Sequence, residues 1–169
     1  HSIPAQLSEP SVSLAVFSLA GLLSYKGLEP ILAEAAIEGE EWEQLQKEAA
    51  AAREPAHPGY KVLSQVASAF VGHEETENLS SPVTFLFSHS LSQQEPRLGR
   101  RMLCAFWEPH NGGGRWSTRG CRVLFSDASS TQCSCTHLTS FAVLMAFYEL
   151  EVSLGPGFSL GSGEESGLL

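Results

Sequence analysis

The sequence CSCTHLTSF at residues 133–141 concentrates side chains that can do chemistry. Two cysteines, one histidine and two threonines fall within seven positions. Thiolates and imidazoles bind zinc, paired cysteines form disulfides, and a histidine near a hydroxyl can act as the base for nucleophilic attack. The cluster therefore raises three alternatives: a metal site, a pair of cross-links or a reactive site.

A zinc site built from Cys133, Cys135 and His137 is disfavoured by the spacing of these residues. On an extended strand the three side chains share a face, but successive members lie about 6.5 to 7 Å apart along the strand. Structural zinc sites usually separate paired cysteines by two to four residues, and here only Ser134 intervenes. We therefore expect no metal and no cofactor in this chain.

The cysteines are better explained as two disulfides. Cys104, Cys121, Cys133 and Cys135 fall within one 32-residue stretch, and an even, local set is typical of cross-links formed in an oxidising compartment. Since Cys133 and Cys135 would lie on one strand, each must bond either Cys104 or Cys121. Both pairings close loops of about 10 to 35 residues, and each bond would contribute about 2 to 4 kcal/mol.

Length and charge limit the class of protein. The 169 residues, 43% of them hydrophobic, supply one modest core, so we expect one domain. The net charge of −9 would repel phosphate backbones, which excludes nucleic acid as an expected partner. Asn78-Leu79-Ser80 is a glycosylation sequon, in agreement with an extracellular setting. The most apolar early run, residues 11–23, is too short to span a bilayer.

The first half of the chain shows strand and helix patterns. Residues 13–25 predict two short strands with a glycine break, favoured over a signal-peptide core because no basic region precedes them. Residues 38–54 predict the one helix, with Trp42 and Leu45 facing the domain. Residues 60–72 predict a strand that pairs, hairpin-like, with a second strand in VTFLFSHS after Pro82.

Short apolar segments alternate with turns from Leu103 onward. The segments MLCAFW, CRVLF, CSCTHL and SFAVLMAFY predict four strands in fewer than 50 residues, arranged as a tight antiparallel meander. Gly112 to Gly114 predict a flexible hairpin tip, and Trp107 and Trp116 are expected in the core beside the cross-links. The tail after Leu154 is rich in glycine and serine and has no period, which predicts disorder.

Taken in order, these residues resemble a known family. The features that match are the four cysteines, the paired tryptophans in FW and GRW, the GC dipeptide, and the HLT tripeptide with the following F and VLM. Residues 104–146 therefore resemble the GPCR proteolysis site, the last part of the GAIN domain of adhesion G-protein-coupled receptors. A weaker resemblance extends back to about residue 13, and the LMAFYELE ending is most similar to the EGF-bearing seven-span subgroup.

The resemblance implies a mainly β fold, a twisted antiparallel β-sandwich with one short helical insertion and a disulfide-clamped C-terminal meander. We divide the chain into a flexible segment at 1–12, the N-terminal part of the sandwich (GAIN subdomain B) at 13–103 with a helix near 38–54, the GPS motif at 104–150, and a disordered tail at 151–169. Of the two disulfide pairings we favour Cys104 with Cys133 and Cys121 with Cys135.

The resemblance also implies a self-cleavage between Leu138 and Thr139. The Thr139 hydroxyl would attack the carbonyl of Leu138, converting the amide to an ester that water releases, with His137 as general base. This would be a single-turnover event rather than the activity of a turnover enzyme, and it requires a kinked turn at Leu138 and Thr139. The alternative is a non-cleaving structural or adhesive extracellular module in which His137 is buried in an uncut sheet.

The strand after the cut would remain in the sheet as a tethered agonist. The resemblance implies that this agonist begins at Thr139 and is anchored by Phe141, Leu144 and Met145. The expected partners are the domain's own cleaved strand, the seven-helix domain of the parent receptor and an unidentified extracellular protein ligand. We expect the extracellular face of the plasma membrane for the full-length parent, and a secreted product where no membrane segment is present.

Overall fold

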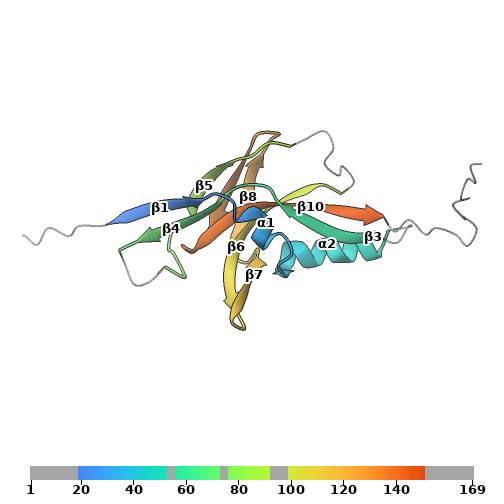
Figure 1. Cartoon of the computed structure of the whole chain (residues 1–169), viewed down its shortest axis with the longest axis horizontal. Helices are drawn as coiled ribbons and strands as arrows, with labels where there is room; N and C mark the ends of the chain where they lie inside the picture. The colour runs from blue at the N-terminus through green and yellow to red at the C-terminus, as the bar shows by residue number, and fades with distance from the viewer. Residues whose placement is uncertain (1–18, 53–55, 73–75, 92–98, 151–169) are drawn as a thin grey trace, which may run out of the picture.

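The computed structural model describes residues 19–52, 56–72, 76–91 and 99–150. Two β-sheets and two helices make up these residues, so the predicted mainly β fold with two packed sheets is confirmed (Figure 1). The expectations for the segments 1–12 and 151–169 lie outside the described residues.

The elements are distributed over two sheets. The larger sheet has the order β1-β4-β10-β6-β7-β2, with β3 also paired to β10, and the smaller sheet has the order β5-β9-β8. All pairings are antiparallel except that of β2 with β7. The larger sheet contains β1 (Ala20–Tyr25), β2 (Ile37–Glu38), β3 (Ala56–Val62), β4 (Val66–Val71), β6 (Arg101–His110), β7 (Gly113–Ser117) and β10 (Ser140–Leu150). The smaller sheet contains β5 (Val83–Ser88), β8 (Cys121–Ser126) and β9 (Ser130–Cys135), and the helices are α1 (Glu29–Leu32) and α2 (Glu40–Ala50).

The strand β10 is central to the larger sheet. It pairs with β6 on one side, and on the other side first with β4 and then with β3. Residues 141–146 of β10 are at most 2% exposed. Their continuous apolar sequence is typical of a strand that is covered on both faces.

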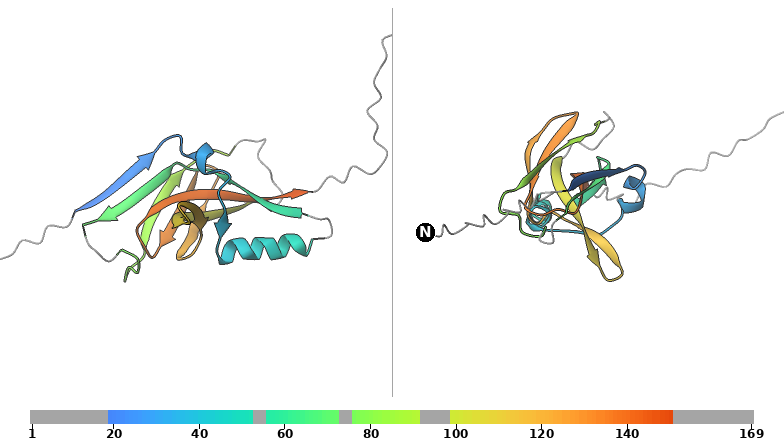
Figure 2. Two further views of the ribbon diagram at one scale, coloured as in Figure 1. Left: turned by 60° about the horizontal axis from the view of Figure 1, so that its bottom comes forward. Right: turned by 90° about the vertical axis from the view of Figure 1, so that its left-hand side faces the viewer.

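Alternating side chains of β6 and β10 face two different cores. Leu103 and Leu144 lie in a cluster with Trp42 and Leu45 of α2, as predicted for these two helix residues. Cys104 of β6, with Phe141 and Val143 of β10, lies in a second cluster with residues of the smaller sheet. The larger sheet is thus covered by α2 on one face and by the smaller sheet on the other (Figure 2).

The predicted strand at 60–72 is in fact two strands. The chain bends after Val62, where the backbone N–H groups of Leu63 and Ser64 both donate to the carbonyl of Val143. The N–H of Val143 donates in turn to the buried hydroxyl of Ser64, 2.9 Å away. The Ser64 hydroxyl thus takes the place of the backbone carbonyl that a neighbouring strand would offer to the N–H of Val143. At this point the neighbour of β10 changes from β4 to β3.

The predicted hairpin between residues 60–72 and the strand after Pro82 is wrong. The strand β5 leaves the larger sheet and pairs with β9, where Val83 lies opposite Cys135. Its alternation is as expected, since Phe87 is buried and Leu86 is 69% exposed. The sequence pattern fixes which face of a strand is apolar, but it does not identify the partner strand.

The glycine break predicted near the N-terminus is also wrong for the described part. The strand β1 continues through Gly21, which lies directly opposite Phe70 of β4. A Cβ atom at Gly21 would come within 2.2 Å of the Phe70 ring, so glycine provides space for that ring. Residues 13–18 lie outside the described residues.

The segment from Leu103 contains five strands rather than four. The sequence GGRWS forms β7, which pairs with β6 across a two-residue turn at Asn111 and Gly112. Both turn residues have positive φ, 48° and 76°, as a tight hairpin of this type requires. Of the five strands, β6, β7 and β10 belong to the larger sheet, and β8 and β9 belong to the smaller one. Trp107 and Trp116 lie against the α2 core rather than beside the disulfides.

Candidate functional site

Both disulfides lie next to the candidate site. Cys104 is bonded to Cys133, which joins the two sheets, and Cys121 is bonded to Cys135, which joins the adjacent strands β8 and β9. The structure thus has the favoured pairing. Cysteines in disulfides are not thiolate ligands, and the described ranges contain no group of three or more His, Cys, Asp or Glu side chains that could hold a metal ion.

The segment His137–Thr139 connects β9 to β10 and thus crosses from the smaller sheet to the larger one. Its backbone is held on both sides: the N–H of Leu138 donates to the carbonyl of Thr76, and the carbonyl of Thr139 accepts from the N–H of Ala69. The chain bends at His137 and at Thr139. Among the described non-glycine residues only Asn111 has a positive φ, so neither Leu138 nor Thr139 has a left-handed backbone.

The imidazole of His137 is buried, with 9% of the residue exposed. It stacks on Phe141 at a centroid distance of 5.4 Å and meets Phe106 edge-on at 4.2 Å. Its Nε2 atom lies 3.2 Å from the backbone carbonyl of Arg119. A carbonyl can only accept, so Nε2 carries the proton, and Nδ1 of the neutral ring is left with a free lone pair.

Burial also favours the neutral form of this ring. Desolvation lowers the pKa of His137 below its ordinary value of 6.5, and the hydrogen bond to the Arg119 carbonyl opposes this effect only in part. At neutral pH the side chain is therefore an uncharged imidazole. An uncharged imidazole can accept a proton, as a general base must.

Two buried polar atoms at this site lack hydrogen-bond partners in the described part of the chain. They are Nδ1 of His137 and Oγ1 of Thr139. Unpaired buried polar atoms are rare and costly, so each needs an explanation. Here they are an acceptor and a hydroxyl on residues two apart, on either side of Leu138, and they are not hydrogen-bonded to each other.

The turn at Thr118–Gly120 contacts His137, and the residue types in this turn did not predict the contact. Gly120 has a φ of 70°, and a Cβ atom there would lie 2.7 Å from Oγ1 of Thr136 and 3.2 Å from the His137 ring. Arg119 contributes a backbone carbonyl, which every residue type has. Only the glycine before Cys121 could have indicated a close approach.

The other predicted site residues are spread around this centre. Phe141, Leu144 and Met145 are all buried in β10, but Phe141 and Leu144 point to opposite faces of the sheet. Asn78 lies exposed in the connection between β4 and β5. The same connection is hydrogen-bonded to the chain just before His137, because the N–H of Leu79 donates to the carbonyl of Thr136.

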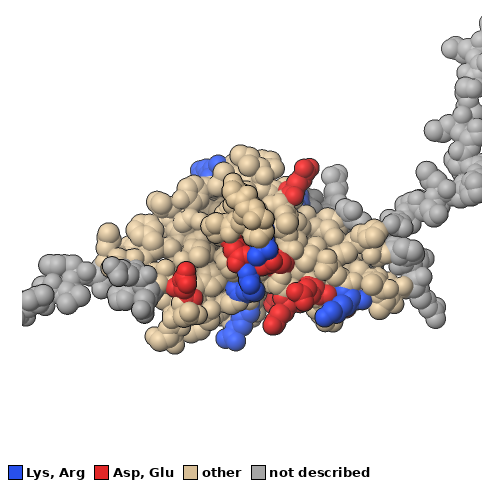
Figure 3. Space-filling model, turned by 90° about the horizontal axis from the view of Figure 1, so that it is seen from below, with Lys and Arg blue, Asp and Glu red and all other residues tan. Residues whose placement is uncertain are grey.

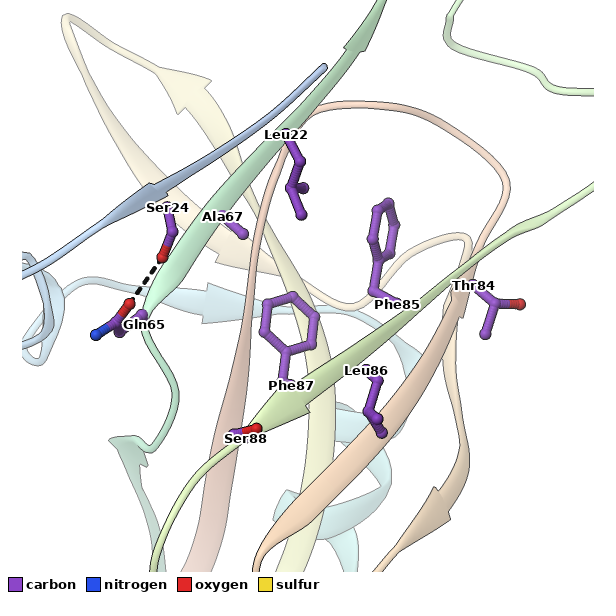
Figure 4. A pocket seen from close by; sticks show the side chains of 9 residues that line it. All are labelled: Leu22, Ser24, Gln65, Ala67, Thr84, Phe85, Leu86, Phe87 and Ser88. Atoms are coloured by element: carbon purple, nitrogen blue, oxygen red, sulfur yellow. Dashed lines mark hydrogen bonds between the residues drawn. The ribbon is translucent and has the colours of Figure 1, made fainter. Parts of the chain in front are cut away.

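A groove of about 470 Å³ opens between β5 and the β1–β4 pair (Figure 4). Phe85 and Phe87 lie along it, and Ser24 donates a hydrogen bond of 2.7 Å to Gln65 across its edge. Its lining contains no charged side chain.

These features define a class: a disulfide-clamped β-sandwich domain whose last, buried strand follows a bent His-Leu-Thr segment. The family described as GPS: GAIN subdomain B matches residues 2–149. The chain belongs to this family, which confirms the resemblance to the corresponding part of adhesion G-protein-coupled receptors.

Comparison with curated proteins gives the same result. Adhesion G protein-coupled receptor E2 of Macaca mulatta is 45% identical over 137 residues, and human adhesion G protein-coupled receptor E2 is 44% identical over 141 residues. Human adhesion G protein-coupled receptor E5 is 36% identical over 148 residues. Each match covers 79% of this chain but only 16 to 18% of the receptor, so the chain spans about one sixth of these relatives.

Proposed function

We propose that this domain is the extracellular autoproteolytic regulatory domain of an adhesion G-protein-coupled receptor, which cuts its own chain between Leu138 and Thr139. Membership of the GAIN subdomain B family supports the receptor context. The observation that carries the proposal is the hydrogen bond from Nε2 of His137 to the Arg119 carbonyl, because it leaves Nδ1 as the basic nitrogen, two residues along the chain from the unpaired Thr139 hydroxyl.

The reaction follows from these groups. Nδ1 of His137 takes the proton of the Thr139 hydroxyl as Oγ1 attacks the carbonyl carbon of Leu138. The new C–O bond forms, the C–N bond breaks, and the proton passes to the departing amine of Thr139. Water then hydrolyses the ester, which leaves a carboxylate on Leu138 and a free hydroxyl on Thr139. Each chain reacts once.

After the cut, β10 would remain in the sheet. Burial of Phe141, Leu144 and Met145 contributes about 1.5 to 3 kcal/mol per side chain. Ladder hydrogen bonds to β3, β4 and β6 add about 0.5 to 1.5 kcal/mol each. The domain then shields the segment that begins at Thr139. If force pulls this segment out of the sheet, or if the part of the domain before the cut is shed, the segment becomes free to act as a tethered agonist on the seven-helix domain of the parent receptor.

The location and modification follow from the same context. The domain acts on the extracellular face of the plasma membrane, where the two disulfides are stable and Asn78 is glycosylated. No helix within the described ranges is long and apolar enough to cross a membrane. Its partners are its own cleaved strand, the seven-helix domain and an extracellular protein ligand of unknown identity.

Denaturing gel electrophoresis tests the proposal. The protein is produced with both disulfides formed, and they are reduced only before the gel is run. Cleavage yields a 31-residue piece, 139–169, whose first residue is Thr139 by Edman sequencing. Thr139→Ala removes the nucleophile and abolishes the piece, whereas Thr84→Ala, at an exposed threonine of β5, leaves it. A single intact wild-type band, from protein in which both disulfides are verified by mass spectrometry, would contradict the proposal.

The alternative is a structural or adhesive module that never cuts. The observations in its favour are the missing hydrogen bond between Nδ1 of His137 and Oγ1 of Thr139 and the absence of a left-handed backbone at Leu138 and Thr139. In this case His137 is a buried side chain bonded to one carbonyl, and the disulfides provide a rigid scaffold. The same gel distinguishes the two functions.

A further inference from the structure

We infer that Arg119 is a positioning residue for His137, and that the ion-pair cluster around Arg119 sets the rate of self-cleavage. The cluster consists of Glu38, Glu108, Arg115 and Arg119. This inference rests on the proposed function, because the rate in question is that of the cut between Leu138 and Thr139.

The cluster ties three strands to one turn. Arg115 of β7 lies 2.7 Å from Glu38 of β2 and 2.7 Å from Glu108 of β6. Arg119 pairs with the same two carboxylates, at 2.8 Å from Glu38 and in close contact with Glu108. The hydrogen bond from Arg115 lowers the pKa of Glu108 most, which keeps this carboxylate charged. Charged groups of both signs gather on the side of the molecule that carries α2 and β7 (Figure 3).

The backbone beside Arg119 is held by the same elements. The N–H of Thr118 donates to the carbonyl of Glu38, and both the backbone N–H and Nε of Arg119 lie within 3.4 Å of the buried Ser117 hydroxyl. Gly39 allows the close approach of this turn, because a Cβ atom there would come within 2.1 Å of the Thr118 hydroxyl. These contacts couple the position of the Arg119 side chain to that of its backbone.

The opposite side of the turn contacts the reactive segment through two backbone carbonyls. The carbonyl of Arg119 accepts from Nε2 of His137, and the carbonyl of Gly120 accepts from the N–H of Thr136 at 2.9 Å. If the Arg119 peptide rotated, Nε2 would lose its acceptor and the proton could move to Nδ1. A ring protonated on Nδ1 cannot take the proton of the Thr139 hydroxyl, so the position of this carbonyl selects the active tautomer.

The variants Arg119→Ala and Arg119→Lys test this inference, with Arg122→Ala as the matched control. Arg122 lies three residues further along, is exposed, and has no ion pair within the part of the chain that the structure describes. Cleavage is followed by pulse-labelling the chain in an oxidising cell-free system and separating the reduced products over time. We expect Arg119→Ala to slow cleavage about 3- to 10-fold, the effect of one hydrogen bond, Arg119→Lys to slow it less, and Arg122→Ala to have no effect.

The tautomer of His137 provides a readout that a purely structural role would not change. In an uncut Thr139→Ala background, long-range ¹H–¹⁵N NMR spectra distinguish protonated Nε2 from protonated Nδ1. We expect Nε2–H alone in the background protein and in its Arg122→Ala form, and a mixture of both tautomers after Arg119→Ala. An unchanged tautomer, or wild-type cleavage by Arg119→Ala, would overturn the inference.

Two arms keep this test separate from that of the proposed function. If the wild-type chain does not cut, the proposed function fails, and the tautomer still reports whether Arg119 positions His137. If Arg119→Ala does not fold, the ionic strength of the wild-type reaction is varied instead. Since the Arg119 side chain is 55% exposed, 0.5 M salt should screen the cluster and slow cleavage about 2- to 5-fold. A rate independent of salt would then overturn the inference.

Discussion

Cys104 of β6 and Cys133 of β9 form the covalent link between the two sheets, with their Cα atoms 5.8 Å apart. Cys104 also lies directly opposite Val143 of the neighbouring strand β10. The link is therefore adjacent to the strand that the proposed cut would free. It holds the smaller sheet over the face of β10 that carries Phe141 and Val143.

Loss of this link should destabilise the domain more than loss of the other disulfide. The Cys104–Cys133 bond spans 29 residues, whereas the Cys121–Cys135 bond spans 14 and joins strands that are already paired. We expect Cys104→Ala/Cys133→Ala to lower the free energy of unfolding by about 2 to 5 kcal/mol. Urea unfolding, followed by tryptophan fluorescence in the uncut Thr139→Ala background, measures the change. An equal or larger loss in Cys121→Ala/Cys135→Ala would contradict the expectation.

Retention of the cleaved strand should depend on Leu144. This side chain is fully buried against the α2 core and lies on the opposite face of β10 from His137, so its truncation spares the reactive site. Leu144→Ala should weaken retention by about 2 to 5 kcal/mol. The urea concentration that separates the 139–169 piece from the body in gel filtration should therefore fall. Leu124→Ala, at a leucine of β8 that is 48% exposed, should leave it unchanged.

The features that could be predicted from the sequence are local ones. The apolar spacing of Trp42 and Leu45 gave the buried face of α2, and the run SFAVLMAFY gave a strand. The number and clustering of the cysteines limited their pairing to two alternatives, of which the favoured one is present. Each of these patterns reports the environment of a side chain, which composition and periodicity record directly.

The features that could not be predicted depend on partners distant in sequence. Nothing in VTFLFS indicates that β5 pairs with β9, and Ser64 gives no sign that its hydroxyl replaces a ladder partner of Val143. The candidate site shows the same limit. His137 and Thr139 were found through their types and spacing, but the acceptor that fixes the tautomer is a main-chain carbonyl at Arg119, for which side-chain identity carries no signal.

Two glycines in turns offer a matched test of the space around His137. Gly120 and Gly112 have nearly the same φ, 70° and 76°, so alanine is similarly strained at both. A Cβ atom at Gly120 would meet Thr136 and the His137 ring, whereas one at Gly112 has nothing within 4 Å. Gly120→Ala should therefore slow self-cleavage at least tenfold, since general-base catalysis contributes about 100-fold or more. Gly112→Ala should cut at the wild-type rate in the same pulse-labelling assay, and equal effects would mean that turn strain alone is responsible.

The pH dependence of cleavage should follow His137. Burial lowers the pKa of His137 below 6.5. The ring is therefore neutral from neutral pH down to this lowered pKa, and the cleavage rate should be constant over that range. Below this pKa the ring is protonated and the rate should fall about tenfold per pH unit. His110→Gln, at the exposed histidine that ends β6, should leave this profile unchanged. A rate that begins to fall above pH 6.5 would contradict the assignment of His137 as the base.

Stability should change in the same direction, which an uncut protein can show separately. Because the pKa of His137 is lower in the folded chain than in the unfolded chain, the unfolded state binds more protons between the two values, and stability rises with pH there. The contribution is complete above the unfolded pKa and is lost as the pH falls through the folded one. His89, whose pKa is also lowered by burial, adds a contribution of the same sign. The urea midpoint of the Thr139→Ala protein should therefore fall as the pH is lowered. Adding His137→Gln should remove part of this pH dependence. If the midpoint of the double variant changes with pH as steeply as before, His137 titrates alike in the folded and unfolded states.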